Sequence, residues 1–215
     1  MEPLTVALPK GRMQDDVLAL FAEAGYPGES DNGRKLIFED AGGRLRFVLA
    51  KPSDVPTYVE YGAADLGVVG QDVVREGGQD LYEPLHLGLG RCRLALAGPA
   101  AWRGRDLRLV PYLRVATTFP RLTLDYFQER GLSAEVIYLS GSVELAPAVG
   151  LADLLVDLVQ SGRTLRENGL VELETIMASE AILVVNRAAQ KLRFRQIQEV
   201  IERLAAALEQ RKAAA

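Results

Sequence analysis

Short apolar segments alternate with segments of helical periodicity along most of this chain. The alternation is typical of β-α-β units, so it predicts an α/β fold with a largely parallel sheet. In the first half, strands are expected at residues 4–8, 35–39, 46–50 and 65–70. The turn at residues 40–43 joins the second and third of these strands and indicates a hairpin. A helix is expected from Met13 to a stop at Gly25, because the apolar positions there lie on one face. A short helix is expected over residues 55–61.

A second set of elements begins near Arg91. It comprises strands at residues 94–97, 114–117, 136–139 and 152–159, and helices at residues 121–130 and 142–149. A strand at residues 180–185 follows, and then a C-terminal helix with an apolar stripe made by Phe194, Ile197, Ile201, Leu204 and Leu208. Two α/β sets of this size predict two lobes, and the cleft between two lobes is the default place for a binding site.

Composition narrows the class of protein. The 215 residues are 48% apolar and 25% charged, which is the ordinary globular range. The net charge of −4 has the wrong sign for contacts with a phosphate backbone, so no nucleic-acid partner is expected. An acid, Glu2, stands where a secretion signal carries positive charge, and no apolar run approaches the roughly 18 residues of a membrane span. The sequence therefore predicts a cytoplasmic protein without a membrane partner.

The chain has one cysteine, Cys92, and one histidine, His86. Cys92 lies in an apolar run and cannot form an internal disulfide, and His86 lies in a strand-like stretch. We interpret both as structural residues, so a histidine-based triad or zinc site is not expected.

The segment from Ser161 to Thr164 is the strongest candidate for chemistry. A buried strand runs into Ser161-Gly162-Arg163-Thr164, which opens a helix. Such a turn presents free backbone N–H groups, two hydroxyls and a guanidinium, which together suit a phosphate group. The alternative is a plain strand-turn-helix junction, with the glycine in the turn and Thr164 as the N-cap.

Carboxylates accompany this turn. Asp153 and Asp157 are spaced to point the same way from an otherwise apolar strand, and buried charges need partners. Sugar hydroxyls or a metal-bound diphosphate would supply them. Glu144 precedes them and, taken alone, is interpreted as a solvated helix charge.

Two further candidates also follow strands. Lys10, Gly11 and Arg12 come after the first strand, where two cations beside a helix start suit a polyanion. The stretch from Lys51 to Tyr58 follows another strand. In open α/β sheets ligands gather at the carboxyl ends of strands, and all three candidates are expected there. The alternative for the first pair of cations is a turn with solvent-facing side chains.

These segments, taken in order, resemble the ATP phosphoribosyltransferase family, which makes the first committed intermediate of histidine biosynthesis. The resemblance covers nearly the whole chain through residues 4–12, 52–70, 90–93 and above all 144–165. The last segment is specific, because it combines Glu144, Asp153 and Asp157 with Ser161-Gly-Arg-Thr-Leu165 at the family's spacing.

The resemblance implies a two-lobed α/β fold similar to type II periplasmic binding proteins, with the active site in the cleft between the lobes. One lobe would be discontinuous, over residues 1–89 and 180–215, and the other would span residues 90–179 and carry the phosphoribosyl pyrophosphate loop. The implied reaction transfers the phosphoribosyl group of phosphoribosyl pyrophosphate to N1 of the adenine of ATP and releases diphosphate, with Mg²⁺ present.

The needs of that reaction place the substrate groups on the candidates. The 5-phosphate of phosphoribosyl pyrophosphate is expected on the turn made by Ser161, Gly162, Arg163 and Thr164. Its ribose hydroxyls or Mg²⁺ are expected near Asp153 and Asp157, with Glu144 beside them, and Asp157 or Asp153 is the metal ligand.

The remaining candidates belong to the diphosphate and the nucleotide. Diphosphate or the ATP phosphates are expected near Lys10, Arg12 and Lys51, and Lys10, Arg12 and Asp157 are the expected catalytic residues. Candidates for ATP binding are Gly11, Lys51, Asp54, Thr57 and Tyr58. Capping and packing explain Asp54, Thr57 and Tyr58 almost as well.

Length bears on the partners. The chain ends about 30 residues after its expected return to the first lobe, which leaves no room after Leu208 for the histidine-binding domain of longer family members. The resemblance is therefore to the short form, which works with a regulatory subunit resembling histidyl-tRNA synthetase in a hetero-octamer. The isolated chain is expected to be a homodimer. The alternative function is a two-lobed small-anion binding module without catalysis, and a third is a catalytically weak scaffold.

Overall fold

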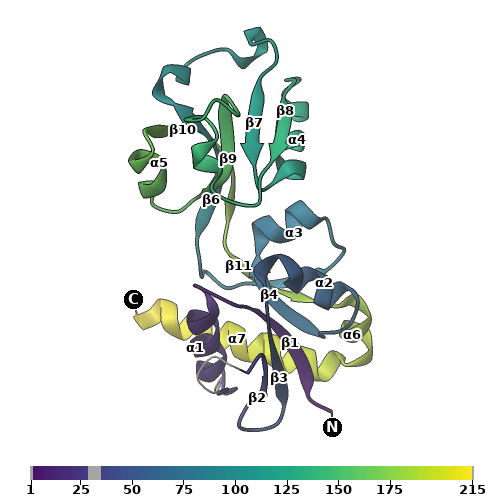
Figure 1. Ribbon diagram of the computed structural model, residues 1–215. Helices are drawn as coiled ribbons and strands as arrows, with labels where there is room; N and C mark the ends of the chain where they lie inside the picture. Colours follow the sequence, from purple (N-terminus) through teal and green to yellow (C-terminus); the bar gives the residue numbers. More distant parts are fainter. Residues whose placement is uncertain (1, 29–34, 215) are drawn as a thin grey trace. The chain divides into compact units, whose positions relative to one another are not determined.

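The chain folds into two compact units, seen in a computed structural model that describes residues 2–28 and 35–214 (Figure 1). Unit 1 comprises Met1–Gly90 and Glu180–Ala215, and unit 2 comprises Arg91–Ser179. The expected division falls one residue earlier, between residues 89 and 90. Across the described residues, no helix combines the length and the apolar composition needed to cross a membrane.

Unit 1 is built on a six-stranded sheet with the order β2-β3-β1-β4-β11-β5. Its strands are β1 (Leu4–Pro9), β2 (Ile37–Glu39), β3 (Leu45–Ala50), β4 (Leu66–Gly70), β5 (Tyr82–His86) and β11 (Ala181–Val185). Its helices are α1 (Gln14–Glu23), η2 (Pro52–Asp54), α2 (Val55–Glu60), α3 (Gln71–Gly77), α6 (Arg187–Leu192) and α7 (Phe194–Ala214).

Unit 2 is built on a five-stranded sheet with the order β10-β6-β9-β7-β8. Its strands are β6 (Cys92–Pro99), β7 (Arg114–Thr117), β8 (Glu135–Tyr138), β9 (Leu154–Val159) and β10 (Leu170–Ser179). Its helices are η3 (Ala100–Trp102), η4 (Leu107–Leu109), α4 (Pro120–Glu129), η5 (Val143–Leu145) and α5 (Arg163–Glu167).

The α/β class is confirmed, but the prediction of a largely parallel sheet is wrong. Strand β1 pairs in parallel with β3 and β4, and β7 pairs in parallel with β8 and β9. The pairs β2·β3, β4·β11, β5·β11, β6·β9 and β6·β10 are antiparallel. Both sheets are therefore mixed. The strands that enter and leave unit 2 run against their neighbours, and strand periodicity carries no information about that direction.

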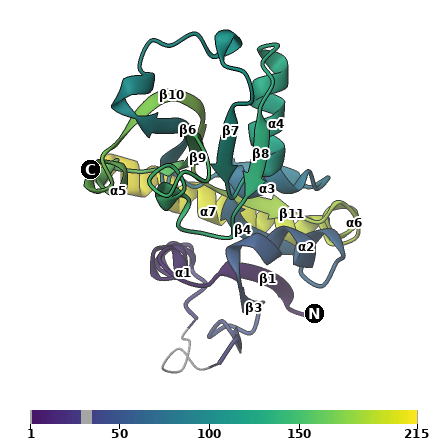
Figure 2. The same cartoon turned by 45° about the horizontal axis from the view of Figure 1, so that its top comes forward.

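Helices cover both faces of the unit 1 sheet. Along β1, Val6 and Leu8 pack against α1 and α7, whereas Ala7 faces α2, as the twofold alternation of a strand requires. Figures 1 and 2 show α7 beside α1, and its apolar stripe buries Ile197, Val200 and Leu204. On the opposite face α2 approaches β4 so closely that a Cβ on Gly67 would lie 2.7 Å from Val59. Glycine at that strand position is thus a packing requirement.

The hairpin between β2 and β3 is confirmed, with the first strand beginning at Ile37 rather than residue 35. Asp40 holds its turn. The carboxylate is buried and accepts backbone N–H bonds from Gly42, Arg44 and Leu45 at 2.6–3.0 Å. Because three N–H donors satisfy its charge, an aspartate can be buried at this turn without a large desolvation penalty.

In unit 2, α4 packs on one sheet face through Tyr126 and Phe127, while η5 and α5 lie on the other through Val143 and Leu165. Figure 2 shows α4 alongside β7 and β8. The consecutive β9 residues alternate between these faces, with Leu154 and Val156 toward α4 and Leu155 and Val159 toward α5. Asp157 has the same parity as Leu155 and belongs to the α5 face.

Two element predictions in unit 2 are corrected. The helix expected over residues 142–149 is only the short turn η5, because Ser142 has a left-handed φ of +50° and Pro147 offers no backbone N–H. Strand β10 was not predicted. Register shifts between Glu172 and Glu174 and between Thr175 and Met177 break its alternation, so the strand has no twofold apolar pattern.

Candidate active site

The turn from Ser161 to Thr164 lies at the carboxyl end of β9 and leads directly into α5. Gly162 has a φ of +70° and is the N-cap, a conformation that glycine adopts without the steric cost of a Cβ. The alternative interpretation of the turn, with Thr164 as the N-cap, is wrong on that point, because the helix begins at Arg163 and Thr164 is its second residue. The first-turn N–H groups of such a helix have no acceptor within the helix. Apart from the Arg163 N–H, which the Ser161 hydroxyl accepts, they are available to an anion.

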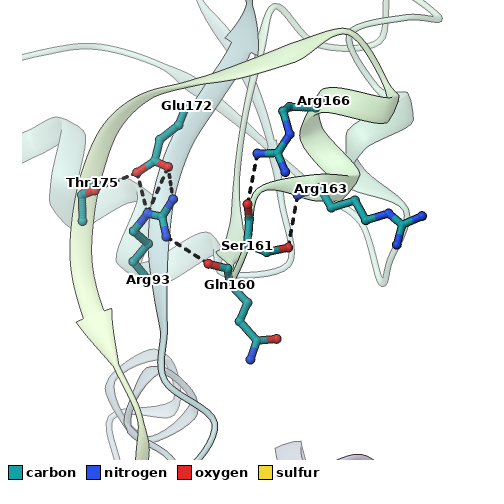
Figure 3. A network of polar contacts seen from close by, with 7 residues as sticks. All are labelled: Arg93, Gln160, Ser161, Arg163, Arg166, Glu172 and Thr175. Carbon is teal, nitrogen blue, oxygen red and sulfur yellow. Dashed lines mark hydrogen bonds and ion pairs between the residues drawn. The ribbon is translucent and has the colours of Figure 1, made fainter.

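Hydrogen bonds to its backbone groups hold this turn in place (Figure 3). The Ser161 hydroxyl accepts the backbone N–H of Arg163 at 3.4 Å, and Nη1 of Arg166 donates to the Ser161 carbonyl at 3.1 Å. Nη1 of Arg93 donates to the Gln160 carbonyl at 3.2 Å. Two guanidinium groups therefore bind two consecutive carbonyls, those of Gln160 and Ser161, just before Gly162.

The side chain of Arg163 does not close over the turn. Its Nε donates to Glu167 at 2.7 Å, 79% of the side chain is exposed, and Figure 3 shows the guanidinium pointing away from Ser161. An exposed i,i+4 ion pair of this kind is weak. A phosphate could therefore replace Glu167 as the partner of the Arg163 guanidinium at a small cost in free energy.

Asp157 and Glu144 are brought near each other on the α5 face of unit 2. Burial raises the pKa of Asp157, the backbone N–H of Leu158 opposes the rise, and the negative charge of Glu144 adds to it. Glu144 is on η5, which packs on β9 through Val143. The interpretation of Glu144 as a charge on a solvated helix is corrected, because η5 is a single turn and the side chain is half-buried. A carboxylate whose pKa is raised by burial and by a second carboxylate nearby forms, with that neighbour, a site that attracts hydroxyl donors or a cation.

Asp153 is not part of this group. It precedes β9, whose six residues span roughly 20 Å, so Asp153 and the Ser161 turn lie at opposite ends of one strand. Its carboxylate accepts the backbone N–H of Arg114 at 2.9 Å and pairs with the Arg114 guanidinium at 3.3 Å. Burial alone would raise the pKa of Asp153, but these bonds outweigh it and lower the pKa. The expectation that Asp153 meets ribose or metal is therefore corrected: it joins β9 to β7.

In unit 1, the residues after β1 and β3 lie side by side. These strands are parallel with Pro9 opposite Ala50, and the Lys10 N–H donates to the Ala50 carbonyl at 2.8 Å. Lys10, Gly11 and Arg12 are exposed at the carboxyl end of these strands, and the exposed Lys51 lies next to them. Gly11 has a φ of +117°, a backbone conformation that side chains disfavour. Three cations, for which the structure of residues 2–28 and 35–214 gives no ion pair, thus lie together at the carboxyl ends of β1 and β3.

Asp54, Thr57 and Tyr58 lie just beyond Lys51 at the start of α2. Asp54 occupies the N-cap position, but its side chain makes no capping bond and accepts the Ser53 hydroxyl at 3.0 Å instead. Thr57 and Tyr58 are exposed, and 41% of Tyr58 is accessible. Capping and core packing therefore do not account for these three side chains.

Two cavities lie away from the predicted residues. One of about 530 Å³ in unit 2 is lined by Trp102, Tyr126 and Arg130 among others, and one of about 310 Å³ in unit 1 is lined by Tyr26 and Arg44 among others. His86 pairs with Glu180 at 3.0 Å, in keeping with a structural role. Within residues 2–28 and 35–214, no three His, Cys, Asp or Glu side chains cluster to hold a metal unaided.

Sequence reasoning missed the arginines behind the turn. Arg93 lies in residues 90–93, which carry part of the family resemblance, but the sequence gives it no function. No sequence pattern points to Arg166 or Glu172 as site residues. Arg93 meets Glu172 across 79 residues of sequence, which no local pattern signals. The only local signal for Arg166 is its position three residues after Arg163, because side chains at that spacing are neighbours on a helix.

Comparison with known proteins identifies the family of this chain. The family model described as ATP phosphoribosyltransferase matches residues 51–206. An ATP phosphoribosyltransferase of Sorangium cellulosum is 50% identical over 208 residues, covering 96% of each chain. The chain belongs to the ATP phosphoribosyltransferase family. The resemblance inferred from residues 144–165 is confirmed.

Solved structures agree with that membership. The chain is similar to an ATP phosphoribosyl transferase (HisG:HisZ) complex from Thermotoga maritima, with a TM-score of 0.84, 34% identity, and coverage of 96% of this chain and 99% of that one. It also shares its fold with the periplasmic aliphatic sulphonate binding protein SsuA from Escherichia coli, with a TM-score of 0.60, 14% identity, and coverage of 99% and 76%. The expected likeness to periplasmic binding proteins is confirmed for the fold of this ATP phosphoribosyltransferase family member.

Proposed function

We propose that this protein transfers the phosphoribosyl group of phosphoribosyl pyrophosphate to N1 of the adenine of ATP and releases diphosphate, the first step of histidine biosynthesis. The observation that carries this conclusion is the 50% identity to an ATP phosphoribosyltransferase over 96% of both chains. The same identity argues against a small-anion binding module without catalysis, because SsuA shares only the fold.

The reaction sets modest demands on acid-base groups. The lone pair of adenine N1 forms a bond to C1 of the ribose while the bond from C1 to the diphosphate oxygen breaks. N1 of ATP carries no proton, so no base is needed at the nucleophile. The leaving diphosphate gains negative charge, and the enzyme must stabilise that charge and hold the reactants in line.

The Ser161–Thr164 turn is the proposed seat of the 5-phosphate. It offers first-turn N–H groups, two hydroxyls and the weakly paired Arg163. Glu144 and Asp157, on the same sheet face, are suited to accept hydrogen bonds from the ribose hydroxyls. Carboxylates near the ribose also favour the positive charge that develops at C1 as the diphosphate departs.

The cations of unit 1 are proposed for the diphosphate and the ATP phosphates. Lys10, Arg12 and Lys51 share one sheet edge, and Gly11 lets a phosphate approach the backbone between two of them. Asp54, Thr57 and Tyr58 stand exposed beyond this edge and supply hydrogen-bonding groups and an aromatic face to the nucleotide.

Phosphoribosyltransferases generally use a divalent metal, and we propose Mg²⁺ here. Mg²⁺ keeps several waters and binds through one or two carboxylates plus substrate phosphates. The Asp157–Glu144 pair fits that requirement. When bound with diphosphate, the ion would neutralise charge on the leaving group.

A partner subunit is proposed from the Thermotoga complex. This chain covers 99% of the matching chain, whose title names HisG with HisZ. We propose that the present protein assembles with a HisZ-type regulatory subunit, which the sequence resemblance expects to be related to histidyl-tRNA synthetase and to form a hetero-octamer. The isolated chain is proposed to be a homodimer.

The decisive experiment is an absorbance assay for phosphoribosyl-ATP with ATP, phosphoribosyl pyrophosphate and Mg²⁺, with and without the partner. Removing the metal with EDTA should abolish product formation, and excess Mg²⁺ should restore it. Thr164→Ala and Arg163→Ala should each weaken phosphoribosyl pyrophosphate binding about tenfold in calorimetry, since each removes a contact to an anion.

Arg121→Ala is the matched control, because Arg121 also forms an exposed i,i+4 pair, with Asp125, on α4. Its affinity for phosphoribosyl pyrophosphate should equal that of the wild type. Absence of product even with the partner present would refute the proposed reaction.

A further inference from the structure

The peptide that enters the phosphate turn is held by a guanidinium from another strand. Nη1 of Arg93, on β6, donates to the carbonyl of Gln160, the residue just before Ser161, at 3.2 Å (Figure 3). Arg93 lies opposite Val159 in the sheet, so its side chain starts beside the end of β9. The carbonyl at the mouth of the turn is therefore fixed from outside the turn.

Arg93 is itself fixed by β10. Its Nε lies 2.8 and 3.0 Å from the two carboxylate oxygens of Glu172, and its Nη2 lies 2.5 Å from one of them. The Thr175 hydroxyl donates to Glu172 at 2.8 Å. The guanidinium thus uses Nε and Nη2 for the carboxylate and keeps Nη1 for the Gln160 carbonyl, a division that its planar fork permits.

Peptide geometry turns this contact into control of an N–H group. The Gln160–Ser161 peptide is trans, so its C=O and N–H point in opposite directions. A guanidinium on the carbonyl side therefore sets where the Ser161 N–H points. Arg166 does the same for the next peptide through the Ser161 carbonyl at 3.1 Å. Hydrogen bonding of a carbonyl to a charged donor also polarises the N–H of the same peptide and makes it a stronger donor.

Stability alone gives little reason for this arrangement. About a third of the Arg93 side chain (36%) and a quarter of Glu172 (26%) are exposed, and ion pairs so near water contribute little to folding. A comparable pair, Arg130 and Glu174, lies two residues along the same strand at 2.9 Å. Arg130 instead reaches the Tyr126 ring and backbone, and no contact given by the structure joins it to the turn.

We propose that Arg93, held by Glu172, is a positioning residue that orients the Gln160–Ser161 peptide so that the Ser161–Thr164 turn presents its N–H groups to the 5-phosphate of phosphoribosyl pyrophosphate. The inference rests on the proposed function for the identity of the ligand. Neither residue needs to touch substrate, because the effect passes through one peptide group.

The test compares Arg93→Lys and Glu172→Gln with Arg130→Lys and Glu174→Gln. A lysine places its donors on one atom and cannot span Glu172 and Gln160 together. Arg93→Lys should raise the KM for phosphoribosyl pyrophosphate about tenfold, as expected for loss of one charge-assisted contact, and leave the KM for ATP and the melting temperature unchanged. Glu172→Gln should show the same split more weakly, and the two control variants should match the wild type.

A second readout needs no activity. Amide hydrogen exchange of the peptide covering residues 160–166 should be faster in Arg93→Lys than in wild type without substrate, and unchanged in Arg130→Lys. Equal effects of Arg93→Lys and Arg130→Lys, equal KM increases for both substrates, or unchanged exchange would overturn the proposal. If exchange responds as expected but wild type with its partner makes no phosphoribosyl-ATP, the proposed function fails while the hold on the turn stands.

Discussion

Asp153 and Asp157 are the same residue type four positions apart, yet their surroundings shift their pKa values in opposite directions. The backbone and guanidinium of Arg114 overcome burial at Asp153 and lower its pKa. Burial dominates at Asp157, Glu144 adds repulsion, and the pKa rises. The groups that surround each side chain in the folded protein, and not its residue type or sequence spacing, determine whether a carboxylate is structural or suited to bind substrate.

Asp157→Asn should lower turnover strongly without lowering stability at neutral pH. A raised native pKa means that the folded protein holds the Asp157 proton more tightly than the unfolded chain does. Wild-type stability therefore falls as the pH rises from the unfolded pKa, about 3.9, through the raised native value. Asparagine removes this penalty, so the melting temperature of the variant relative to wild type should increase over that pH window and then level off.

The measurement is thermal unfolding from pH 3.5 to 8, paired with kcat at saturating substrate. A variant with a much lower melting temperature and normal kcat at pH 7 would move Asp157 to a structural role.

Strand β9 shows how one element can serve two purposes. Its amino end is tied to β7 through Asp153 and Arg114, and its carboxyl end carries the turn. The parallel pairing of β7 and β9 is thus secured at the end away from the ligand. At the carboxyl end, the N–H groups of the turn are available to a ligand, and Arg93 and Arg166 bind the carbonyls of Gln160 and Ser161.

Asp153→Asn should therefore affect stability and leave catalysis intact. The native pKa is lowered, so the carboxylate stabilises the fold above the unfolded pKa, and that contribution is lost as the pH falls through the lower native value. At pH 7 we expect a loss of about 1 kcal/mol in the free energy of unfolding, the typical size of a partly exposed charge-assisted bond.

Urea unfolding at pH 7 and at pH 2.5 measures this difference, which should shrink at the lower pH. An unchanged free energy of unfolding together with a large rise in the KM for phosphoribosyl pyrophosphate would return Asp153 to the substrate site.

At the scale of the whole molecule, chemistry is divided between units made from separate stretches of chain. Unit 2 carries the turn and the carboxylates, and unit 1 carries the cations Lys10, Arg12 and Lys51. Neither set alone has all the charges that the proposed reaction needs, since one suits the 5-phosphate and ribose and the other suits diphosphate.

Regulation is expected to reside in the partner. Histidine should leave the activity of the isolated chain unchanged and inhibit it once a HisZ-type subunit is added, because the resemblance to the short form of the family implies feedback through the partner. Initial rates over a histidine titration, with and without the partner subunit, check this. Inhibition of the isolated chain would place a histidine site within its own 215 residues.

Much of the fold follows from local pattern. Twofold and helical periodicities are properties of neighbouring residues, so they identified β1, β3, β4, β9, α1 and α7 and the α/β class. The turn at Ser161 and the cations after β1 were found the same way, because ligand groups follow strands in such folds. The family resemblance rested on the spacing of residues 144–165, which is also local.

Tertiary structure decided what depends on contacts between distant residues. Strand direction, the irregular β10 and the pairing of Arg93 with Glu172 across 79 residues leave no trace in local periodicity, since register and bulges are set by the whole sheet. The same holds for Asp153, whose sequence spacing matched Asp157 but whose partner is Arg114. The sequence by itself determined which residue types follow which strands, and the packed sheet determined which of them are free to meet a substrate.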